Sequence, residues 1–272
     1  MRARARRWAQ RLMEGSLQPR YFGPAERRLF GVYHPAVGQL RATVLLCPPL
    51  LHEQVRSYRF FSQMAVQLTG AGLACLRFDY YGTGDSEGED DAFLPANTRQ
   101  DLELAAAELR RCAGDAPMIL MAARGSALLA HRDAAAVGAC ALWLWQPVAD
   151  GGRYLQSLQA RDRAERSSRY RYPLLRREAR SGPHDLMGFA LSPDFPEQLA
   201  ALRIGDAPAG VKVAVLDVAG AAEMPAEMRG PLPLAVSAWV DEIDLDGLIP
   251  LREARAGLEA LVSDIPRWTA HG

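Results

Sequence analysis

The chain has 272 residues, of which 49% are apolar, enough for one large domain with a continuous buried core. Its formal charges cancel to zero, which excludes a global field that would recruit nucleic acid or anionic lipid. The cysteines and histidines have no metal-ligand or redox spacing, so we expect no metal and no cofactor. No apolar run approaches the ~20 residues that span a bilayer, and we expect a cytoplasmic protein without a transmembrane segment.

The predicted elements begin after a basic N-terminal tail. Residues 1–20 are rich in arginine but lack the apolar core of a secretory signal, so we expect a solvated segment. Residues 21–33 are expected to form a strand or hairpin. Short apolar runs then predict strands at 43–47, 73–80, 118–121 and 138–145, and helical periodicity predicts helices at 60–68, 97–111 and 126–132. This alternation predicts an α/β fold with a mostly parallel, doubly wound sheet.

The middle of the chain changes in character. Residues 161–180 are rich in arginine and have poor core periodicity, which suits a small cap over the carboxyl edge of the sheet. Strand patterns return at 211–218 and 232–240, and a helix is predicted at 252–262. We therefore expect a first core part at 21–150, a cap-like insertion at 151–205 and a second core part at 206–265.

Several segments carry a resemblance to a known family. They are Cys-Pro-Pro at 47–49, Arg-Ser-Tyr-Arg at 56–59, Leu-Arg-Phe-Asp-Tyr-Tyr-Gly-Thr-Gly-Asp-Ser at 76–86, Trp-Gln-Pro-Val-Ala-Asp-Gly at 145–151 and Gly-Phe-Ala-Leu-Ser at 188–192. Together they resemble the serine aminopeptidase-like branch of the α/β-hydrolase superfamily, over roughly residues 30–262. More narrowly, the chain is similar to hydrolase-like proteins of exosortase systems and biosynthetic clusters, which often have arginine at the nucleophile elbow. The resemblance implies an α/β-hydrolase fold with a short helical cap and a hydrolase of esters, thioesters or amides.

The turn at 122–126 is the most informative stretch. A nucleophile elbow needs small residues two positions before and two after its tip, and Ala122 and Ser126 meet this requirement if Arg124 is the tip. Arginine stays cationic and cannot accept an acyl group. Where relatives often have aspartate after the tryptophan, this chain has Gln146, so no role of that carboxylate transfers.

The rest of a Ser-His-Asp triad is also hard to find. The acid would follow the strand at 211–218, where Glu223 and Asp217 are available. A histidine is expected soon after residue 240, but the next one is His271, beside the C-terminus. The sequence therefore predicts a degenerate triad, and we assign no catalytic residue firmly.

An alternative is an active hydrolase with a non-classical site. His52, in the loop expected after the first core strand, would act as base, with Ser126 or Cys47 as nucleophile. The structural interpretations are that Ser126 is small and helps to cap a helix, that Cys47 packs in the core, and that His52 is a loop residue. Asp79 and Asp85 are interpreted as structural, with Asp85 satisfying amides of the glycine-rich turn.

Arg124 itself has two interpretations. A guanidinium at a helix N-terminus suits a carboxylate, phosphate or sulfate, which predicts an anion site with Arg124, Gly125, His52 and Leu50 as ligand-binding residues. Alternatively, an internal acid holds it, with Glu53, Asp79 or Glu223 as candidates. The first predicts a non-hydrolytic or weakly active accessory that binds an acidic small molecule, free or carrier-bound, or a partner protein of a biosynthetic system. The alternating charges of Glu53, Arg56, Arg59 and Arg77 are expected to form surface ion pairs.

Overall fold

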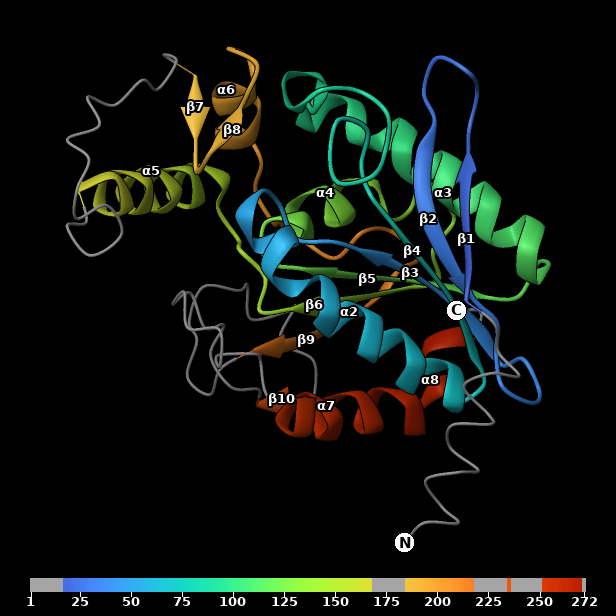
Figure 1. Ribbon diagram of the computed structural model, residues 1–272. Coiled ribbons are helices and arrows are strands. Elements are labelled where there is room, and N and C mark those ends of the chain that lie inside the picture. Colours follow the sequence, from blue (N-terminus) through green and yellow to red (C-terminus); the bar gives the residue numbers. More distant parts are fainter. Residues whose placement is uncertain (1–16, 168–183, 218–233, 236–250, 271–272) are drawn as a thin grey trace, which may run out of the picture.

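The computed structural model describes residues 17–167, 184–217, 234–235 and 251–270 (Figure 1). Its main sheet has the strand order β1-β2-β4-β3-β5-β6-β9-β10. The strands are β1 (Gln18–Phe22), β2 (Leu29–His34), β3 (Ala42–Cys47), β4 (Leu73–Phe78), β5 (Met118–Ala123), β6 (Ala141–Trp145), β9 (Lys212–Asp217) and β10 (Leu234–Ala235). β1 and β2 run antiparallel, and the strands from β4 to β10 pair in parallel. An antiparallel β2 beside a parallel sheet in this order is the α/β-hydrolase fold, as the sequence predicts.

Helices cover both faces of the sheet (Figure 1). One face carries α2 (His52–Gly70), α7 (Leu251–Ser263) and α8 (Ile265–Thr269), and the other carries α3 (Thr98–Ala113) and α4 (Ser126–Asp133). Side chains alternate along each strand, so Val44 and Leu46 join the core beneath α2 while Leu45 and Cys47 join the core on the α3 and α4 face. Both faces of the central strands are buried, which is why these strands have continuous apolar sequences.

A second group of elements stands beside the sheet, in the region expected to be a cap. It comprises α5 (Gly151–Ser167), the small hairpin of β7 (Asp185–Leu186) and β8 (Phe189–Ala190), and α6 (Phe195–Ala200). α5 packs on α6, and an isolated bridge joins Asp150 to Arg203 where this group leaves and rejoins the core. Residues 168–183, which include most of the arginine-rich segment, lie outside the described residues.

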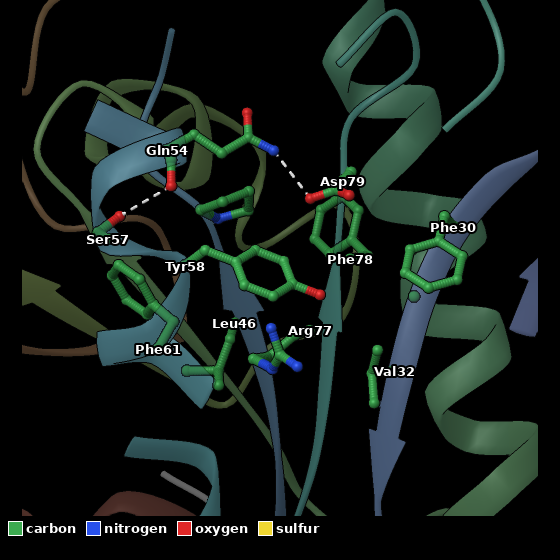
Figure 2. A pocket seen from close by; sticks show the side chains of 12 residues that line it. Phe30, Val32, Leu46, Gln54, Ser57, Tyr58, Phe61, Arg77, Phe78 and Asp79 are labelled. Atoms are coloured by element: carbon green, nitrogen blue, oxygen red, sulfur yellow. Dashed lines mark hydrogen bonds between the residues drawn. The ribbon is translucent and has the colours of Figure 1, made fainter. Parts of the chain in front are cut away.

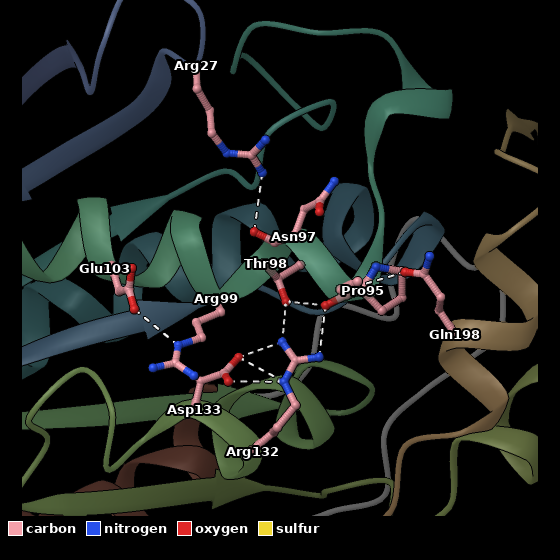
Figure 3. A network of polar contacts seen from close by, with 10 residues as sticks. Arg27, Pro95, Asn97, Thr98, Arg99, Glu103, Arg132, Asp133 and Gln198 are labelled. Atoms are coloured by element: carbon pink, nitrogen blue, oxygen red, sulfur yellow. Dashed lines mark hydrogen bonds and ion pairs between the residues drawn. The ribbon is translucent and has the colours of Figure 1, made fainter.

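A polar network fixes the helices on the α4 side (Figure 3). The guanidinium of Arg132 contacts the carboxylate of Asp133 and donates to the carbonyl oxygen of Pro95 and the hydroxyl of Thr98. Pro95 begins η2 (Pro95–Asn97), the second of two short 3₁₀ stretches after η1 (Asp90–Ala92), and η2 leads into α3. The network therefore ties the end of α4 to the start of α3 and holds the helix that begins at the candidate site.

Some predicted boundaries were wrong. β1 begins at Gln18, inside the expected tail, because its pairing with β2 orders that end of the chain. α2 extends back to His52, eight residues before the expected helix start, so His52 is not a loop residue. The polar residues of this first part obscured its periodicity. Of the strand expected at 232–240, Leu234–Ala235 is described and the remainder lies outside the described residues.

Among the described residues, no helix is both long and apolar enough to cross a membrane. In the same part of the chain, no group of three or more histidine, cysteine, aspartate or glutamate side chains is arranged to hold a metal ion.

Candidate functional site

The candidate site is the tight turn between β5 and α4. Arg124 lies at its centre with φ +55°, a conformation that costs a residue with a Cβ roughly 1–2 kcal/mol. The backbone N–H of Arg124 donates to the carbonyl of Trp145 at 3.1 Å, and its carbonyl accepts from Ala127 at 3.1 Å and Val148 at 3.2 Å. These bonds pin the turn between the ends of β5 and β6 and the start of α4.

The guanidinium of Arg124 pairs with Glu53 of α2. Its Nε lies 3.0 Å from Glu53 Oε1, and its NH1 group donates to the carbonyl of Gln146 at 3.3 Å. The Glu53 side chain is 3% exposed and that of Arg124 is 23% exposed. Of the three acids proposed as partners of Arg124, Glu53 is the one that pairs with it. The expectation that Glu53 forms a surface ion pair was wrong, because its side chain is buried. A carboxylate buried this deeply is stable only if it is paired and hydrogen-bonded.

A phenol from the cap region completes the network. The hydroxyl of Tyr154, on α5, donates to the second carboxylate oxygen, Glu53 Oε2, at 2.7 Å. Tyr154 is 3% exposed, and a Cβ added to Gly125 would collide with its ring and crowd Leu50. Gly125, Leu50 and Tyr154 therefore pack closely against the turn. One carboxylate links the turn, the first helix and the cap region.

The first turn of α2 presents Glu53 to Arg124. Leu51, just before the helix, has φ +54° and ψ −131°, and the N–H of Glu53 bonds back to the carbonyl of Leu50 at 3.2 Å. This sharp bend after β3 turns α2 so that Glu53 faces the end of β5. The acid also lies in the first helical turn, where a negative charge is favoured by the helix dipole.

The two alternative nucleophiles are both inside the core. Ser126 is fully buried, and its Oγ accepts from the Ala123 N–H at 3.1 Å and donates to the carbonyl of Ala123 (2.8 Å) or Cys47 (3.2 Å). It makes no side-chain cap bond to the helix, so the capping role expected for it is wrong: it joins the ends of β3 and β5. Cys47 is also fully buried, and burial raises the pKa of its thiol to about 12. Such a thiol is unionised at neutral pH and a poor nucleophile.

The remaining predicted site residues are spread over several elements. His52 is the first residue of α2, next to Glu53, and is half-buried. Gln146 has φ +41° and donates its N–H to Leu216 at 2.7 Å, so it closes the adjoining turn after β6. Glu223 and His271 lie outside the described residues, and of Asp217 only the backbone, at the end of β9, is described.

The glycine-rich turn after β4 is structural, with one correction. Asp79, not Asp85, satisfies the local groups: its Oδ2 accepts from the Asp85 N–H at 3.0 Å and its Oδ1 from Gln54 Nε2 at 2.8 Å. Gly84 (φ +56°) sits against that carboxylate, where a Cβ would collide. Asp79 is better placed for this role because it leaves the buried strand directly, whereas Asp85 is exposed.

Comparison with known proteins adds structural neighbours. No protein-family model and no curated protein matches the sequence. Solved structures that resemble it include a lidless α/β serine hydrolase from Xanthomonas campestris (22% identity, 49% of this chain and 62% of that chain, TM-score 0.43). Others are an esterase from Pyrococcus furiosus (16%, 59% and 60%, TM-score 0.46) and a carboxyl esterase from Bacillus coagulans (14%, 56% and 52%, TM-score 0.43). The chain thus spans less than two thirds of each of these neighbours.

Sequence reasoning missed Tyr154. It lies 101 residues from its partner Glu53, in a segment with weak helical periodicity, and no local pattern marks it. Glu53 was considered only as one of three partners. The contact that joins both to Arg124 depends on the bend at Leu51 and on where α5 packs, which are tertiary features.

Proposed function

We propose that this chain is a non-hydrolytic or weakly active accessory protein on the α/β-hydrolase fold, and that the Arg124 turn is the counterpart of the nucleophile elbow. The supporting observation is the Arg124–Glu53–Tyr154 network, in which a guanidinium stands between β5 and α4 and is held by a buried carboxylate. Hydrolysis through a covalent intermediate needs an accessible nucleophilic side chain, which a permanently charged arginine cannot supply. The hydroxyl of Ser126, two residues after Arg124, is buried and bonded to backbone.

The ligand class follows from the chemistry of the turn. Arg124 retains 23% exposure and lies at the N-terminal end of α4, where the helix dipole adds positive potential. An acidic small molecule, free or bound to a carrier, would contact the guanidinium from this exposed side. Glu53 would act as the internal counter-ion that holds Arg124 in place. The bound anion would then share the guanidinium with Glu53. We expect this accessory protein to act in an exosortase system or a biosynthetic cluster.

The test is a calorimetric titration of the full chain with succinate and with inorganic phosphate. We expect at least one of them to bind, and Arg124→Ala to weaken that binding at least tenfold, or about 1.4 kcal/mol. Arg203→Ala removes the same charge from an exposed ion pair near the cap region and should leave the affinity unchanged. If Arg124→Ala does not fold, Arg124→Asn keeps a residue that tolerates positive φ and serves in its place. Equal affinity in wild type and the Arg124 variant, or no binding of either anion, would contradict the proposed ligand class.

A further inference from the structure

A pocket that shares no lining residue with the Arg124 network lies between α2 and strands β2 and β4 (Figure 2). It encloses about 390 Å³ of space, its open mouth included. Apolar side chains such as Val32, Phe61 and Phe78 form most of the wall, and Arg77 supplies a cationic group. Half of the lining residues belong to the segments 47–49, 56–59 and 76–86, which carry the sequence resemblance and which the proposed function leaves unused.

Arg77 is the unusual member of this pocket. It is 9% exposed, although it was expected in a surface ion pair, so that expectation was wrong. Its Nε donates to His34 Nε2 at 3.1 Å, and its guanidinium lies 4.8 Å from the centre of the Tyr58 ring. Among the described residues, no carboxylate lies within ion-pair distance of Arg77, and its two terminal amino groups have no hydrogen-bond acceptor. Figure 2 shows the Tyr58 ring reaching from α2 toward β4, over Arg77.

The two titratable neighbours leave this positive charge without a counter-ion in contact. His34 is 2% exposed, and burial followed by the charge of Arg77 lowers its pKa to about 4, so it accepts from Arg77 as a neutral ring. Asp79 directs its carboxylate oxygens to Gln54 and to the Asp85 amide. The terminal amino groups of Arg77 are not among the fully buried polar atoms, so they face the pocket with unused donors that a bound anion would accept from.

We propose that this pocket binds the carboxylate of a small organic acid, with the guanidinium of Arg77 as its partner and the apolar part of the acid against Tyr58 and Phe61. Carboxylate matches the planar donor fork of arginine. A singly charged anion is favoured over a phosphate dianion because Asp79 also lines the pocket. The enclosed part of the pocket is small, so only the carboxylate of the acid enters it. The apolar part of the acid lies under the Tyr58 ring, which is 44% exposed.

The experiment is an NMR titration of the isotope-labelled full chain with benzoate, followed at the Arg77 Nε–H and the Tyr58 ring. Benzyl alcohol, which keeps the ring but lacks the charge, and inorganic phosphate are the matched ligands. We expect saturable shifts at Arg77 and Tyr58 with benzoate, and at least tenfold weaker binding of both other compounds. Arg77→Gln should weaken benzoate binding at least tenfold, whereas Arg99→Gln, which removes an exposed arginine from α3, should not change it.

Opposite results would overturn the inference. These are no saturable shift at Arg77, equal binding of benzyl alcohol or phosphate, or benzoate binding that Arg77→Gln leaves intact. If Arg77→Gln does not fold, Tyr58→Ala at a half-exposed position decides: weaker benzoate binding supports the site, and unchanged binding overturns it. Arg124→Ala should keep the Arg77 shifts, so failure of the proposed function and failure of this inference are distinguishable.

Discussion

The Arg124–Glu53 pair should show a large coupling energy in a double-mutant cycle. The cycle compares Arg124→Ala, Glu53→Gln and the double variant with the wild type. Alanine shares the positive-φ penalty of arginine at this turn, so the backbone cost changes little and the cycle reports the side chains. Glutamine keeps an acceptor for the Tyr154 hydroxyl, so that contact survives in the second variant.

The magnitude follows from burial. Arg124→Ala leaves the Glu53 carboxylate, 3% exposed, without its cation, and breaking a buried pair in this way costs 3–5 kcal/mol. Glu53 keeps its hydrogen bond from the Tyr154 hydroxyl, and water can reach it where the Arg124 side chain was. We therefore expect the free energy of unfolding to fall by an amount near the lower limit, about 3 kcal/mol. Glu53→Gln leaves a guanidinium that is 23% exposed and should cost about 1–2 kcal/mol. Because the double variant has no stranded charge, we expect a coupling energy of about 2 kcal/mol.

Urea unfolding followed by far-UV circular dichroism measures these values. The exposed pair Arg99–Glu103 is the control, with side chains 57% and 50% exposed, and its coupling should stay below about 1 kcal/mol. A coupling for Arg124 and Glu53 no larger than that of the control would refute the claim that this is a buried, structure-holding pair.

Three further predictions concern other residues. Folding lowers the pKa of His34 from 6.5 to about 4, so the unfolded chain binds the proton more readily. The free energy of unfolding should therefore fall by up to about 3 kcal/mol as the pH drops from 6.5 to 4. His34→Gln should flatten this part of the stability–pH curve. The Cys47 thiol should react with iodoacetamide only as the chain unfolds, and peptide mass spectrometry showing rapid labelling of the native protein would contradict its burial. Gly125→Ala should destabilise the protein by about 1–3 kcal/mol in urea unfolding because the added Cβ meets the Tyr154 ring. Gly205→Ala, where an added Cβ meets open space, should be close to neutral. Equal effects of the two substitutions would show that the turn is not closely packed.

The central strands were predictable because each is a short apolar run whose two faces are both buried. β3 and β5, for example, were located to within two residues of their observed ends. The alternation of these runs with helices also predicted the parallel sheet. The small residues around Arg124 likewise pointed to a tight turn between strand and helix, and Arg124 has the positive φ of such a turn. These features are local, and local pattern is what a sequence displays directly.

The candidate site was less predictable because its contacts span the chain. Glu53, in a polar stretch, and Arg77, a charge within the apolar run of β4, both look like surface residues, yet tertiary packing buries both. His52 looked like a loop residue because the helix that it begins opens with polar side chains. Tyr154 reaches Glu53 only because α5 packs against the turn. In each case the burial of a polar side chain depends on a partner distant in sequence.

A guanidinium ion pair, rather than an accessible nucleophile, occupies the turn between β5 and α4. Intact-protein mass spectrometry after incubation with a fluorophosphonate tests this most directly, because the reagent marks activated serines and needs no knowledge of the substrate. We expect an unchanged mass for the native protein. A stoichiometric adduct that maps to Ser126 and disappears in Ser126→Ala would contradict it.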